Sequence, residues 1–356
     1  MKVLVAGDWH SDLHEAEVCK SLRRLGHEAV EFRWFHHFQF DTTRPHSPDA
    51  LIKRFQNKYV IGPLIAAINR EFVDKVRRHR PELIFVYRGT HLWAETLQRV
   101  RDEFPNCRLV GYNNDDPFSP AQPRYVWRHF LAGVPVYDLV LAYRHANLEE
   151  LRRAGARKVD LMRSWYVPDR NHPVELTEDD KKIYACDVVF VGHFEPDQRL
   201  EYLEAIVDRG YSLRLFGPGK YWQKSLEQSA LLSHLAPVRM VWGEDYNKAL
   251  CGAKVVLCFL SKLNRDSYTR RCFEIPAARA LMLSEFSPDL ASLYEKGVEV
   301  DFFGTKEELL ERVDFYVRHE SVRADVAAAG HAKVRAAGHD IDSRISKMLE
   351  TATCGH

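Results

Sequence analysis

Residues 254–284 have the sequence KVVLCFLSKLNRDSYTRRCFEIPAARALMLS, and this stretch decides the fold that we expect. The apolar runs Lys254–Phe259 and Leu281–Ser284 are typical of buried strands, and Thr269–Arg279 between them is typical of a helix. A strand, a helix and a second strand in this order form the unit from which parallel sheets are built. The stretch therefore predicts an open parallel sheet covered by helices.

The same alternation of strands and helices recurs along the chain, with one interruption. In the first half, the expected strands are Lys2–Ala6, Ala29–Arg33, Leu83–Tyr87, Arg108–Tyr112, Leu139–Ala142 and Val159–Met162. In the second half, the expected strands are Asp187–Val191, Ser212–Phe216, Val238–Val241, Lys254–Phe259, Leu281–Ser284 and Val298–Asp301. Two successive open α/β domains of the Rossmann-like type are therefore expected.

The interruption sets the expected domain boundaries. Residues 166–182 contain two prolines and an acidic cluster without clear periodicity, which is typical of a linker. We expect an N-terminal domain over 1–165, a linker over 166–182, a second domain over 183–338, and a C-terminal helix within 339–356 that packs near the domain boundary. Two such sheets would hold ligands at the carboxyl ends of their strands, in a cleft that both domains face.

Composition excludes several classes of protein. The chain has 356 residues, of which 46% are hydrophobic and 28% are charged, as in an ordinary globular protein. Its seven cysteines form no CxxC pair, so no cysteine zinc site is indicated. The first apolar run, Val3–Ala6, is too short for a signal peptide or a membrane span, and a cytoplasmic location is expected.

Charge is distributed unevenly along the chain. Residues 1–165 contain 26 Lys or Arg and 20 Asp or Glu, whereas the remainder contains 25 and 30. A basic N-terminal half suits an anionic or lipid-linked acceptor, or peripheral contact with a membrane. A solvated surface of uneven charge is the alternative. No dense basic stripe with interleaved aromatic residues occurs, so nucleic acid is not expected as a partner.

The start of the helix expected at Thr269–Arg279 is the sharpest candidate for a ligand site. A helix N-terminus offers unpaired N–H groups and a partial positive charge, which suit a diphosphate. Arg270 and Arg271 add guanidinium groups that can bind phosphate oxygens, and Glu274 lies one turn further along the same face. A carboxylate there can accept hydrogen bonds from both ribose hydroxyls. The alternative is an exposed helix start with an Arg–Glu pair.

The stretch from about Ser261 to Lys347 resembles the C-terminal part of CgeB-like (spore-maturation type) glycosyltransferases, which are related to glycosyl transferases group 1. Those proteins carry an Arg-x-Phe-Glu-x-x-Ala segment, matched here by Arg271–Ala277, and an apolar strand that ends in phenylalanine, matched by Gly297–Phe303. The resemblance implies the GT-B fold and a nucleoside diphosphate sugar as donor. It also implies that Glu274 binds the donor ribose.

The resemblance extends to other loops of the second half. The family has two acids eight positions apart, and Asp266 takes the place of the first, which implies a position near the donor sugar. The family also has a segment in which a strand is followed by a glycine and two basic residues. Gly192, His193 and Arg199, after the strand expected at Asp187–Val191, resemble that segment. That segment implies two cationic groups near the donor diphosphate, with a glycine that permits close approach of the backbone.

Two further segments follow expected strands of the second half. Gly217 and Gly219 flank a proline at the carboxyl end of a strand, where they would line the cleft, and a simple turn is the alternative. Trp242 and Gly243 lie where such folds hold the nucleotide base, and an indole or a backbone amide can hold a flat ring. The alternative for Trp242 is core packing, because tryptophan is usually heavily buried.

In the first half, three residues near the carboxyl ends of expected strands are candidates for a catalytic base: His10, His91 and Asp115. The neighbouring carboxylates of Asp115 and Asp116 can raise one another's pKa towards values suited to proton transfer. Asp116, which precedes a proline, also suits a turn cap. The turn after the first strand is not GxGxxG, so a nicotinamide cofactor is not expected.

These observations predict a glycosyltransferase that moves a sugar from a nucleoside diphosphate sugar to a hydroxyl acceptor without a metal or another cofactor. An inverting reaction would use one of the three candidate bases, whereas in a retaining reaction the leaving phosphate could take the proton. Two alternatives remain open on the same scaffold: a sugar-nucleotide epimerase or hydrolase, and a non-catalytic two-lobed protein that binds sugar nucleotides.

Overall fold

The computed structural model describes residues 1–353, which form two compact units. The first unit consists of Met1–Arg163 together with the chain from Ile341 onward, and the second unit is Ser164–Asp340. Each unit contains one parallel sheet, as the alternation of strands and helices predicts. The segment 166–182, which we expected to be a linker, belongs to the second unit, and helix α7 (Glu178–Tyr184) begins within it.

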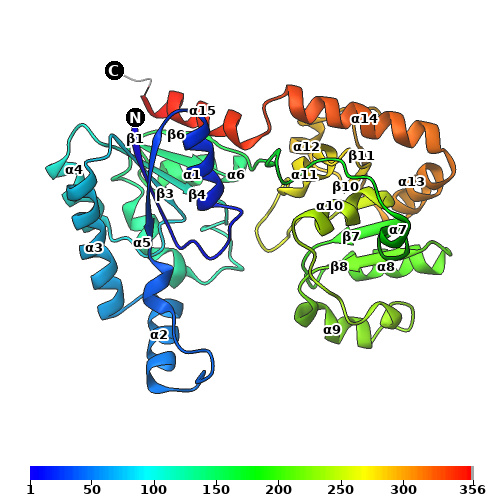
Figure 1. Ribbon diagram of the computed structural model, residues 1–356, viewed down its shortest axis with the longest axis horizontal. Coiled ribbons are helices and arrows are strands. Elements are labelled where there is room, and N and C mark those ends of the chain that lie inside the picture. The colour runs from blue at the N-terminus through cyan, green and yellow to red at the C-terminus, as the bar shows by residue number, and fades with distance from the viewer. Residues whose placement is uncertain (354–356) are drawn as a thin grey trace. The chain divides into compact units, whose positions relative to one another are not determined.

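The sheet of the first unit has six strands in the order β2-β1-β3-β4-β5-β6 (Figure 1). Its strands are β1 (Lys2–Gly7), β2 (Glu28–Arg33), β3 (Leu83–Tyr87), β4 (Arg108–Asn113), β5 (Leu139–Ala142) and β6 (Val159–Leu161). They agree with the six expected strands to within one residue at each end. Most of their side chains are buried on both faces, because helices cover both sides of a parallel sheet.

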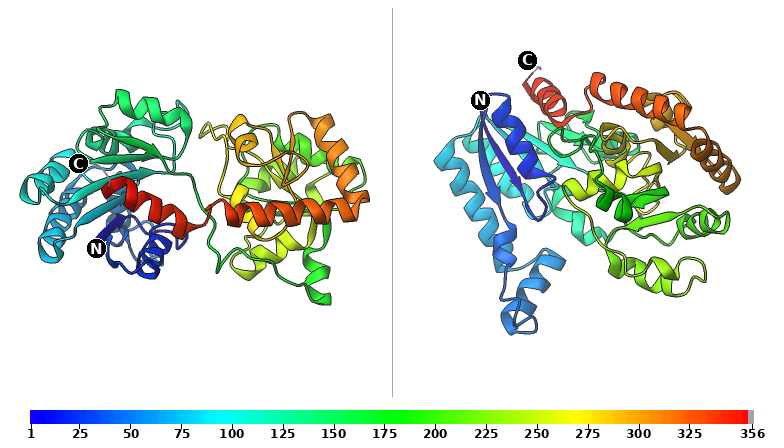
Figure 2. Two further views of the ribbon diagram at one scale, coloured as in Figure 1. Left: turned by 90° about the horizontal axis from the view of Figure 1, so that it is seen from above. Right: turned by 45° about the vertical axis from the view of Figure 1, so that its right-hand side comes forward.

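Helices surround this sheet. They are α1 (Glu15–Arg24), η1 (Phe35–Phe38), α2 (Pro48–Tyr59), α3 (Pro63–His79), α4 (Ala94–Glu103), α5 (Arg124–Gly133), α6 (His145–Arg153) and α15 (Ile341–Thr353). Figures 1 and 2 show α15, the last helix of the chain, beside α1. Two hydrogen bonds of 2.9 and 2.7 Å between Arg24 and the carboxylate of Asp342 join these helices, so α15 packs on the first unit.

The sheet of the second unit has five strands in the order β11-β10-β9-β7-β8. Its strands are β7 (Cys186–Val191), β8 (Leu213–Phe216), β9 (Ala253–Cys258), β10 (Met282–Glu285) and β11 (Asp301–Phe303). The prediction of a strand over 238–241 is wrong, because only Arg239 pairs with the sheet, through a single bridge to Phe216. Pro237, just before this segment, has no N–H group and cannot donate a hydrogen bond to a neighbouring strand.

The last strand was expected over Val298–Asp301, but the observed strand β11 begins at Asp301, the final residue of that range. A tight turn occupies the preceding residues, in which the N–H of Gly297 donates to the carbonyl of Val300 at 2.7 Å. The helices of the second unit are α7, α8 (Arg199–Asp208), α9 (Gly219–Glu227), η2 (Ser233–Leu235), α10 (Glu244–Cys251), α11 (Arg271–Ala277), α12 (Pro288–Leu293), α13 (Lys306–Arg318) and α14 (Glu320–Ala336). Over residues 1–353, no helix combines the length and the apolar character needed to cross a bilayer.

Candidate active site

In the second unit, the strand order reverses between β7 and β9. The chain passes from β7 to β8 on one side, whereas β10 and β11 follow β9 on the other side. Parallel sheets bind ligands at the carboxyl ends of strands at such a point, because the two following loops diverge and leave a crevice. These loops are 192–198 and 259–270, and they contact each other through a 3.1 Å hydrogen bond from the N–H of Lys262 to Glu195.

Arg271 is the first residue of α11, directly after the second of these loops. Its guanidinium carbon lies 6.0 Å from the ring centroid of Phe190, near the end of β7. Among the residues that the structure describes, Arg271 has no ion-pair partner, and its buried Nε has no hydrogen-bond partner. A buried donor without a partner is costly unless a ligand accepts its hydrogen bond, and a guanidinium favours an anion. Of the predicted residues, Arg271 is therefore the best placed to contact a phosphate.

Glu274 lies one turn after Arg271 and is buried, with 8% of its surface exposed. The Tyr246 hydroxyl of α10 donates a 2.8 Å hydrogen bond to its Oε2, whereas no described residue donates to Oε1. Burial, and then the charge of Glu274, raise the pKa of Tyr246 well above its usual value, so this hydroxyl remains a donor. Glu274 is therefore an oriented hydrogen-bond acceptor.

Trp242 precedes α10, and 62% of its surface is exposed. The alternative of core packing is wrong, because residues 238–241 do not form a strand that would carry the indole into the core. Gly243, the N-cap of α10, has a φ of 57°, a conformation that favours glycine. The indole, four residues before Tyr246, offers an exposed flat surface at the start of α10, of the kind on which a base can stack.

Sequence reasoning missed Tyr246. A single tyrosine in an expected helix carries no motif, and its bond to Glu274 joins two helices that are distant in the sequence. The one available signal was its spacing from Trp242, which places both residues at the same end of α10.

The N-terminus of α11 differs from the expectation. The first three N–H groups after Arg271 donate to the carbonyl oxygens of Thr269 and Arg270 at 2.9–3.2 Å, because the chain enters the helix through a tight turn. The helix is also short, which limits the partial charge at its end. The prediction that several unpaired backbone N–H groups bind the diphosphate is therefore wrong. The candidate site on α11 consists of side chains instead.

The two neighbouring arginines have different surroundings. The Nε of Arg270 donates to Ser164 Oγ at 3.4 Å, and its guanidinium carbon lies 5.7 Å from the ring centroid of Trp165. Arg270 thus contacts the segment that opens the second unit, whereas Arg271 lies near the end of β7. Of the two, Arg271 is therefore the better placed to contact a phosphate.

Arg199, the first residue of α8, is 3% exposed and already neutralised. Its Nε and Nη2 donate to the carboxylate of Asp197 at 2.7 Å, and Nη1 donates to the carbonyl of His193 at 2.6 Å. Since all three nitrogens are engaged, Arg199 orders the loop after β7 and offers no free charge to a phosphate, contrary to the prediction.

Desolvation and the Arg271 charge lower the pKa of His193, so this imidazole is not a second cation at neutral pH.

Three predicted glycines permit close backbone packing near the carboxyl ends of β7 and β8. A Cβ on Gly217 would lie 2.1 Å from the carbonyl oxygen of Gly192, and that oxygen accepts a 2.9 Å hydrogen bond from the indole of Trp222. A Cβ on Gly219 would lie 2.4 Å from the carbonyl oxygen of Val238. This packing explains why glycine occupies these positions, and contact with a donor sugar stays a prediction.

Asp266 lies in the loop before α11. Its N–H donates to the carbonyl of Ser261 at 2.8 Å and closes a turn. Arg265 before it has a φ of 49°, which is uncommon for a residue with a side chain. The loop is thus tightly bent towards α11, and contact between Asp266 and a donor sugar stays a prediction.

A cavity of about 410 Å³ lies elsewhere in the second unit. Cys251, Lys254 and Ala278 are among the residues that line it, and they lie at the end of α10, the start of β9 and the end of α11, respectively. It therefore lies at the amino ends of the strands, away from Arg271. Arg279 also lines it, in a left-handed conformation with a φ of 56°, at the position where the resembling family has glycine.

In the first unit, the strand order reverses between β1 and β3. His10 follows β1, and both its N–H and its Nδ1 lie 2.8 Å from Asp8 Oδ1. The hydrogen bond to Asp8 raises the pKa of His10. Trp9 and Arg88, in the two loops at this point, have φ values of 60° and 65°, a strained conformation that clusters at functional sites. His10 is therefore an oriented imidazole at a typical ligand position.

His91 lacks the environment of a catalytic base. It is 6% exposed, and its ring centroid lies 5.6 Å from that of Trp34 and 5.3 Å from that of Phe38. Burial lowers the pKa of His91 to about 3. Its Nε2 lies 3.0 Å from Asn57 Oδ1 of α2. The prediction for His91 is therefore wrong, and this residue joins α2 to the end of β3.

The two neighbouring acids after β4 have separate roles. Asp115 forms a 2.8 Å ion pair with Arg88, so its charge is partly compensated, and its action as a base stays a prediction. Asp116 is fully buried, and its Oδ1 accepts hydrogen bonds from the N–H of Phe118 at 3.0 Å and from Asn147 Nδ2 at 2.9 Å. Asp116 is therefore the turn cap that we expected as one of two possibilities.

Glu15 at the start of α1 is a buried carboxyl group that the sequence did not point to. It is 2% exposed, and its Oε1 accepts a 3.3 Å hydrogen bond from the N–H of Trp9. Burial raises the pKa of Glu15 from 4.5 to about 7. The group is therefore largely neutral in the folded chain at mildly acid pH.

This pKa predicts how stability depends on pH. Because the folded chain binds the Glu15 proton more tightly than the unfolded chain, the stabilisation is complete below the unfolded pKa and is lost as pH rises through about 7. The difference corresponds to about 3 kcal/mol. When pH is raised from acid to neutral, we expect the free energy of unfolding of Glu15→Gln to fall by less than that of the wild type, as measured by urea denaturation. The same pH dependence in both proteins would contradict the assignment.

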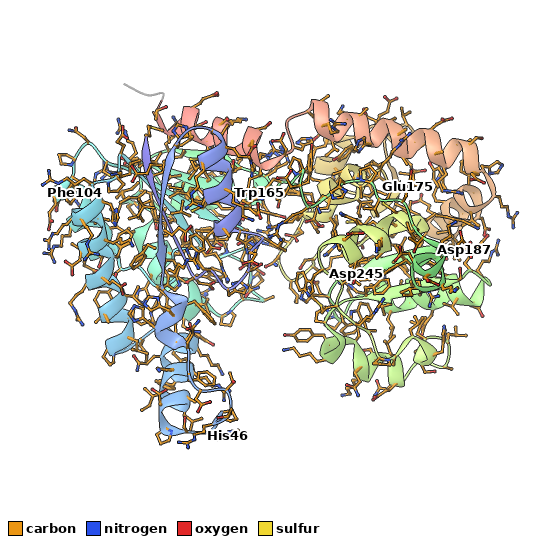
Figure 3. All side chains as sticks on the ribbon, in the orientation of Figure 1. His46, Phe104, Trp165, Glu175, Asp187 and Asp245 are labelled. Atoms are coloured by element: carbon orange, nitrogen blue, oxygen red, sulfur yellow. The ribbon has the colours of Figure 1, made fainter. Side chains whose placement is uncertain are left out.

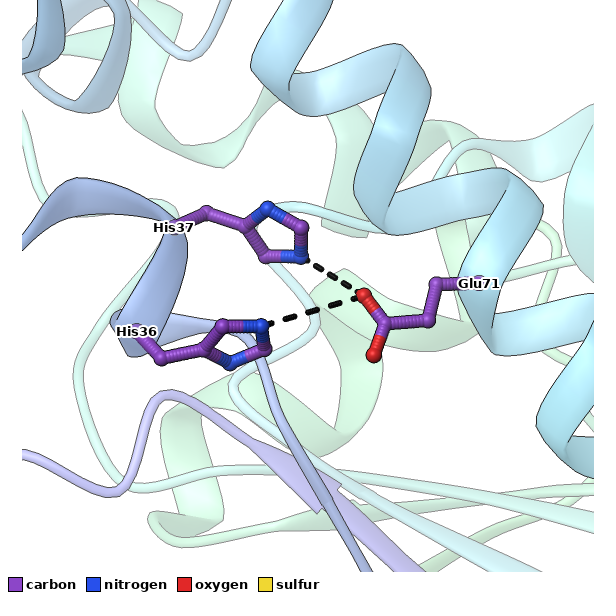
Figure 4. Close-up of side chains that lie close together, drawn as sticks. All are labelled: His36, His37 and Glu71. Carbon is purple, nitrogen blue, oxygen red and sulfur yellow. Dashed lines mark hydrogen bonds and ion pairs between the residues drawn. The ribbon is translucent and has the colours of Figure 1, made fainter.

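Two adjacent histidines meet a carboxylate on the surface of the first unit (Figure 4). His37 Nε2 lies 2.8 Å from Glu71 Oε2, and His36 Nε2 lies 3.8 Å from the same oxygen. The side chains of His36 and Glu71 are about half exposed, and the three groups are fewer than the four ligands of a structural zinc site. The distances fit one hydrogen bond and one weak ion pair, and we assign this cluster no role in the site.

Sequence comparison matches residues 199–350, which include α10 and α11, to the glycosyl transferase-like family. A comparison of the sequence with curated proteins finds no significant match.

Solved structures resemble nearly the whole chain. The Anabaena protein Alr3699/HepE in complex with UDP-glucose has a TM-score of 0.65 at 15% identity, covering 99% of this chain and 100% of that chain. A glycosyltransferase from Rickettsia africae has a TM-score of 0.67 at 12% identity, covering 99% and 97%. Sucrose-phosphate synthase from Thermosynechococcus elongatus has a TM-score of 0.68 at 14% identity, covering 98% and 97%. The chain thus has the GT-B fold, and its residues 199–350 match the model of the glycosyl transferase-like family.

Proposed function

We propose that the chain transfers a sugar from a nucleoside diphosphate sugar to a hydroxyl acceptor. The observation that carries this proposal is the half-buried Arg271, whose guanidinium has no ion-pair partner among the described residues. It lies one turn from an oriented carboxylate, Glu274, beside the reversal of strand order in the second sheet. A diphosphate needs the first group, and the adjoining ribose needs the second. The family match over residues 199–350 supports the same function.

In this proposal, Arg271 stabilises the negative charge that builds on the departing diphosphate, from a position that needs little reorganisation. Glu274 accepts hydrogen bonds from the ribose, and Tyr246 holds its carboxylate in place. The exposed indole of Trp242 stacks on the base. Because the similar Anabaena protein was solved with UDP-glucose, a UDP-sugar is the first donor to test.

The acceptor side and the setting of the reaction are further parts of the proposal. His10, held by Asp8, and Asp115 are the candidate bases of an inverting reaction, and in a retaining reaction the leaving phosphate takes the proton. We propose that no metal is needed, because a guanidinium supplies the positive charge. The CgeB-like subtype rests on the matches at Arg271–Ala277 and Gly297–Phe303, and a cytoplasmic location is proposed with it.

A screen of sugar nucleotides, with release of free nucleoside diphosphate as the readout, tests this function. We expect one class of donor to release the diphosphate, faster with a hydroxyl acceptor present, at a rate that EDTA leaves unchanged. An epimerase would convert the sugar without releasing the diphosphate, and a binding protein would gain thermal stability without turnover. Either of these results would contradict the proposal.

Replacing Trp242 by alanine is expected to weaken donor binding about 5- to 150-fold, because stacking on a base contributes about 1–3 kcal/mol. Stability should change little, since the side chain is 62% exposed. Calorimetric titration with the donor measures the effect, and the neighbouring Met240→Ala, at a residue that is 39% exposed, is the matched control. Equal affinities of the two variants and the wild type would remove Trp242 from the site.

A further inference from the structure

The connection between β2 and α3 contains an additional helical segment. We call residues 34–62 the α2 arm; it comprises η1, an irregular loop and α2. Figures 1 and 2 show α2 extending away from the sheet of the first unit. Figure 3 places His46, in the loop before α2, at the outer end of the arm. The arm therefore presents a face of α2 that the sheet does not cover.

The outward face of α2 is apolar, which reverses the usual pattern of a surface helix. Leu51, Ile52 and Phe55 share this face and are 51%, 56% and 54% exposed. The buried positions of α2 are Ala50 and Gln56, which are 0% and 6% exposed. The helix thus packs on its own unit through a small and a polar side chain while its large apolar side chains contact water.

Polar contacts hold α2 firmly in this position. Arg128 Nη2 of α5 donates to the carbonyl of Tyr59 at 2.7 Å, and Asn57 lies within hydrogen-bond distance of His91. Both contacts join the inner side of the helix to the body of the unit. The exposure of the apolar face therefore belongs to the folded state of the arm.

Basic side chains border the apolar face. Residues 34–62 contain four Lys or Arg and two Asp. Arg54 and Lys58 flank the apolar face, and the one acid of α2, Asp49, forms a 3.0 Å ion pair with Lys53. An apolar face edged by cations is complementary to a bilayer whose headgroups are anionic, because the apolar side chains reach the acyl region and the cations stay at the phosphates.

We propose that the outward face of α2, formed by Leu51, Ile52 and Phe55 and bordered by Arg54 and Lys58, docks on the surface of a bilayer that contains anionic phospholipid. The helix lies in the plane of the interface and does not span it. A protein partner without an acidic surface would be complementary to the apolar residues but not to the basic residues beside them.

The position of the arm links this surface to the acceptor side. His91, which contacts the arm through Asn57, lies just after the carboxyl end of β3, at the edge of the first sheet that also carries His10. A lipid-linked hydroxyl acceptor in the bilayer would therefore be presented near that edge. This consequence rests on the proposed function, whereas docking itself does not.

Co-sedimentation of the full chain with vesicles tests docking without donor or acceptor. We expect the protein to bind vesicles of equimolar phosphatidylcholine and phosphatidylglycerol, to bind phosphatidylcholine alone at least tenfold more weakly, and to lose binding as salt is raised. The double variant Ile52→Glu, Phe55→Glu should reduce binding to the mixed vesicles at least tenfold. Arg54→Glu with Lys58→Glu should remove the preference for phosphatidylglycerol.

The matched control is Leu231→Glu with Val298→Glu, at two residues of the second unit that are 38% and 46% exposed. This variant should bind vesicles like the wild type, and circular dichroism of each variant checks its fold. Equal vesicle binding by the wild type and the Ile52, Phe55 variant overturns the proposal. It is also overturned if the wild type does not bind vesicles but forms a dimer that this variant dissociates, because the face then joins two copies of the chain. Because no substrate is present, neither outcome depends on transfer activity.

Discussion

Replacing Arg271 by alanine is expected to lower kcat for sugar transfer about 100- to 1,000-fold, the effect of removing one preorganised group that stabilises charge in a transition state. The guanidinium has no ion-pair partner among the residues that the structure describes, so its charge is available to the leaving diphosphate. Initial rates at saturating donor measure the change. The loss should be larger in kcat than in donor KM, because negative charge on the diphosphate grows towards the transition state.

Arg270→Ala is the matched control, since its guanidinium contacts Ser164 and Trp165. We expect it to change kcat only about twofold, because a guanidinium that contacts its own unit contributes little to stabilising charge on the leaving group. Thermal unfolding separates catalysis from folding: loss of the unpaired Arg271 cation should not lower the Tm. An Arg271→Ala protein with normal kcat and a reduced Tm would make Arg271 a structural residue and leave the site without its cation.

Replacing Glu274 by alanine is expected to raise the donor KM about 10- to 100-fold with a smaller effect on kcat. Hydrogen bonds to a charged group contribute about 1.5–3 kcal/mol, and the ribose contacts are the same in the ground and transition states. Steady-state kinetics with the donor varied measure this split. A donor that lacks a ribose hydroxyl should bind the wild type more weakly but lose little further affinity for the variant, because the carboxylate that reads this hydroxyl is already absent.

Tyr246→Phe provides a graded companion to this variant. It leaves the Glu274 carboxylate in place but removes its 2.8 Å hydrogen bond, so the increase in donor KM should be smaller than that of Glu274→Ala. If Glu274→Ala retains the wild-type KM, or if both variants lose only thermal stability, the Tyr246–Glu274 pair supports packing of α10 on α11 and does not bind ribose.

The sheets were predictable because buried parallel strands have a strong local signature. β3 and β5 consist of apolar residues throughout, and their observed bounds are those expected. The segment 238–241 is also mainly apolar, with one arginine, yet only Arg239 pairs with the sheet. Local composition could not reveal this difference, because pairing at a sheet edge depends on the neighbouring strand and on contacts such as that between Gly219 and Val238.

The site was predictable in part. The motif around Arg271 and Glu274 pointed to the helix that carries the guanidinium without an ion pair and the oriented carboxylate, since charged residues after an apolar strand are conspicuous in a sequence. Which charges are already neutralised could not be predicted, because the ion pair of Arg199 with Asp197 depends on loop conformation. For the same reason, the burial of His91 against Trp34 was visible only in the folded chain.

A crystal structure of the chain with bound UDP is the most direct test of the central claim. The account predicts ribose hydroxyls at about 3 Å from the Glu274 carboxylate and a phosphate oxygen at about 3 Å from the Arg271 guanidinium. A diphosphate bound elsewhere, with Arg271 still lacking an anionic partner, would contradict it.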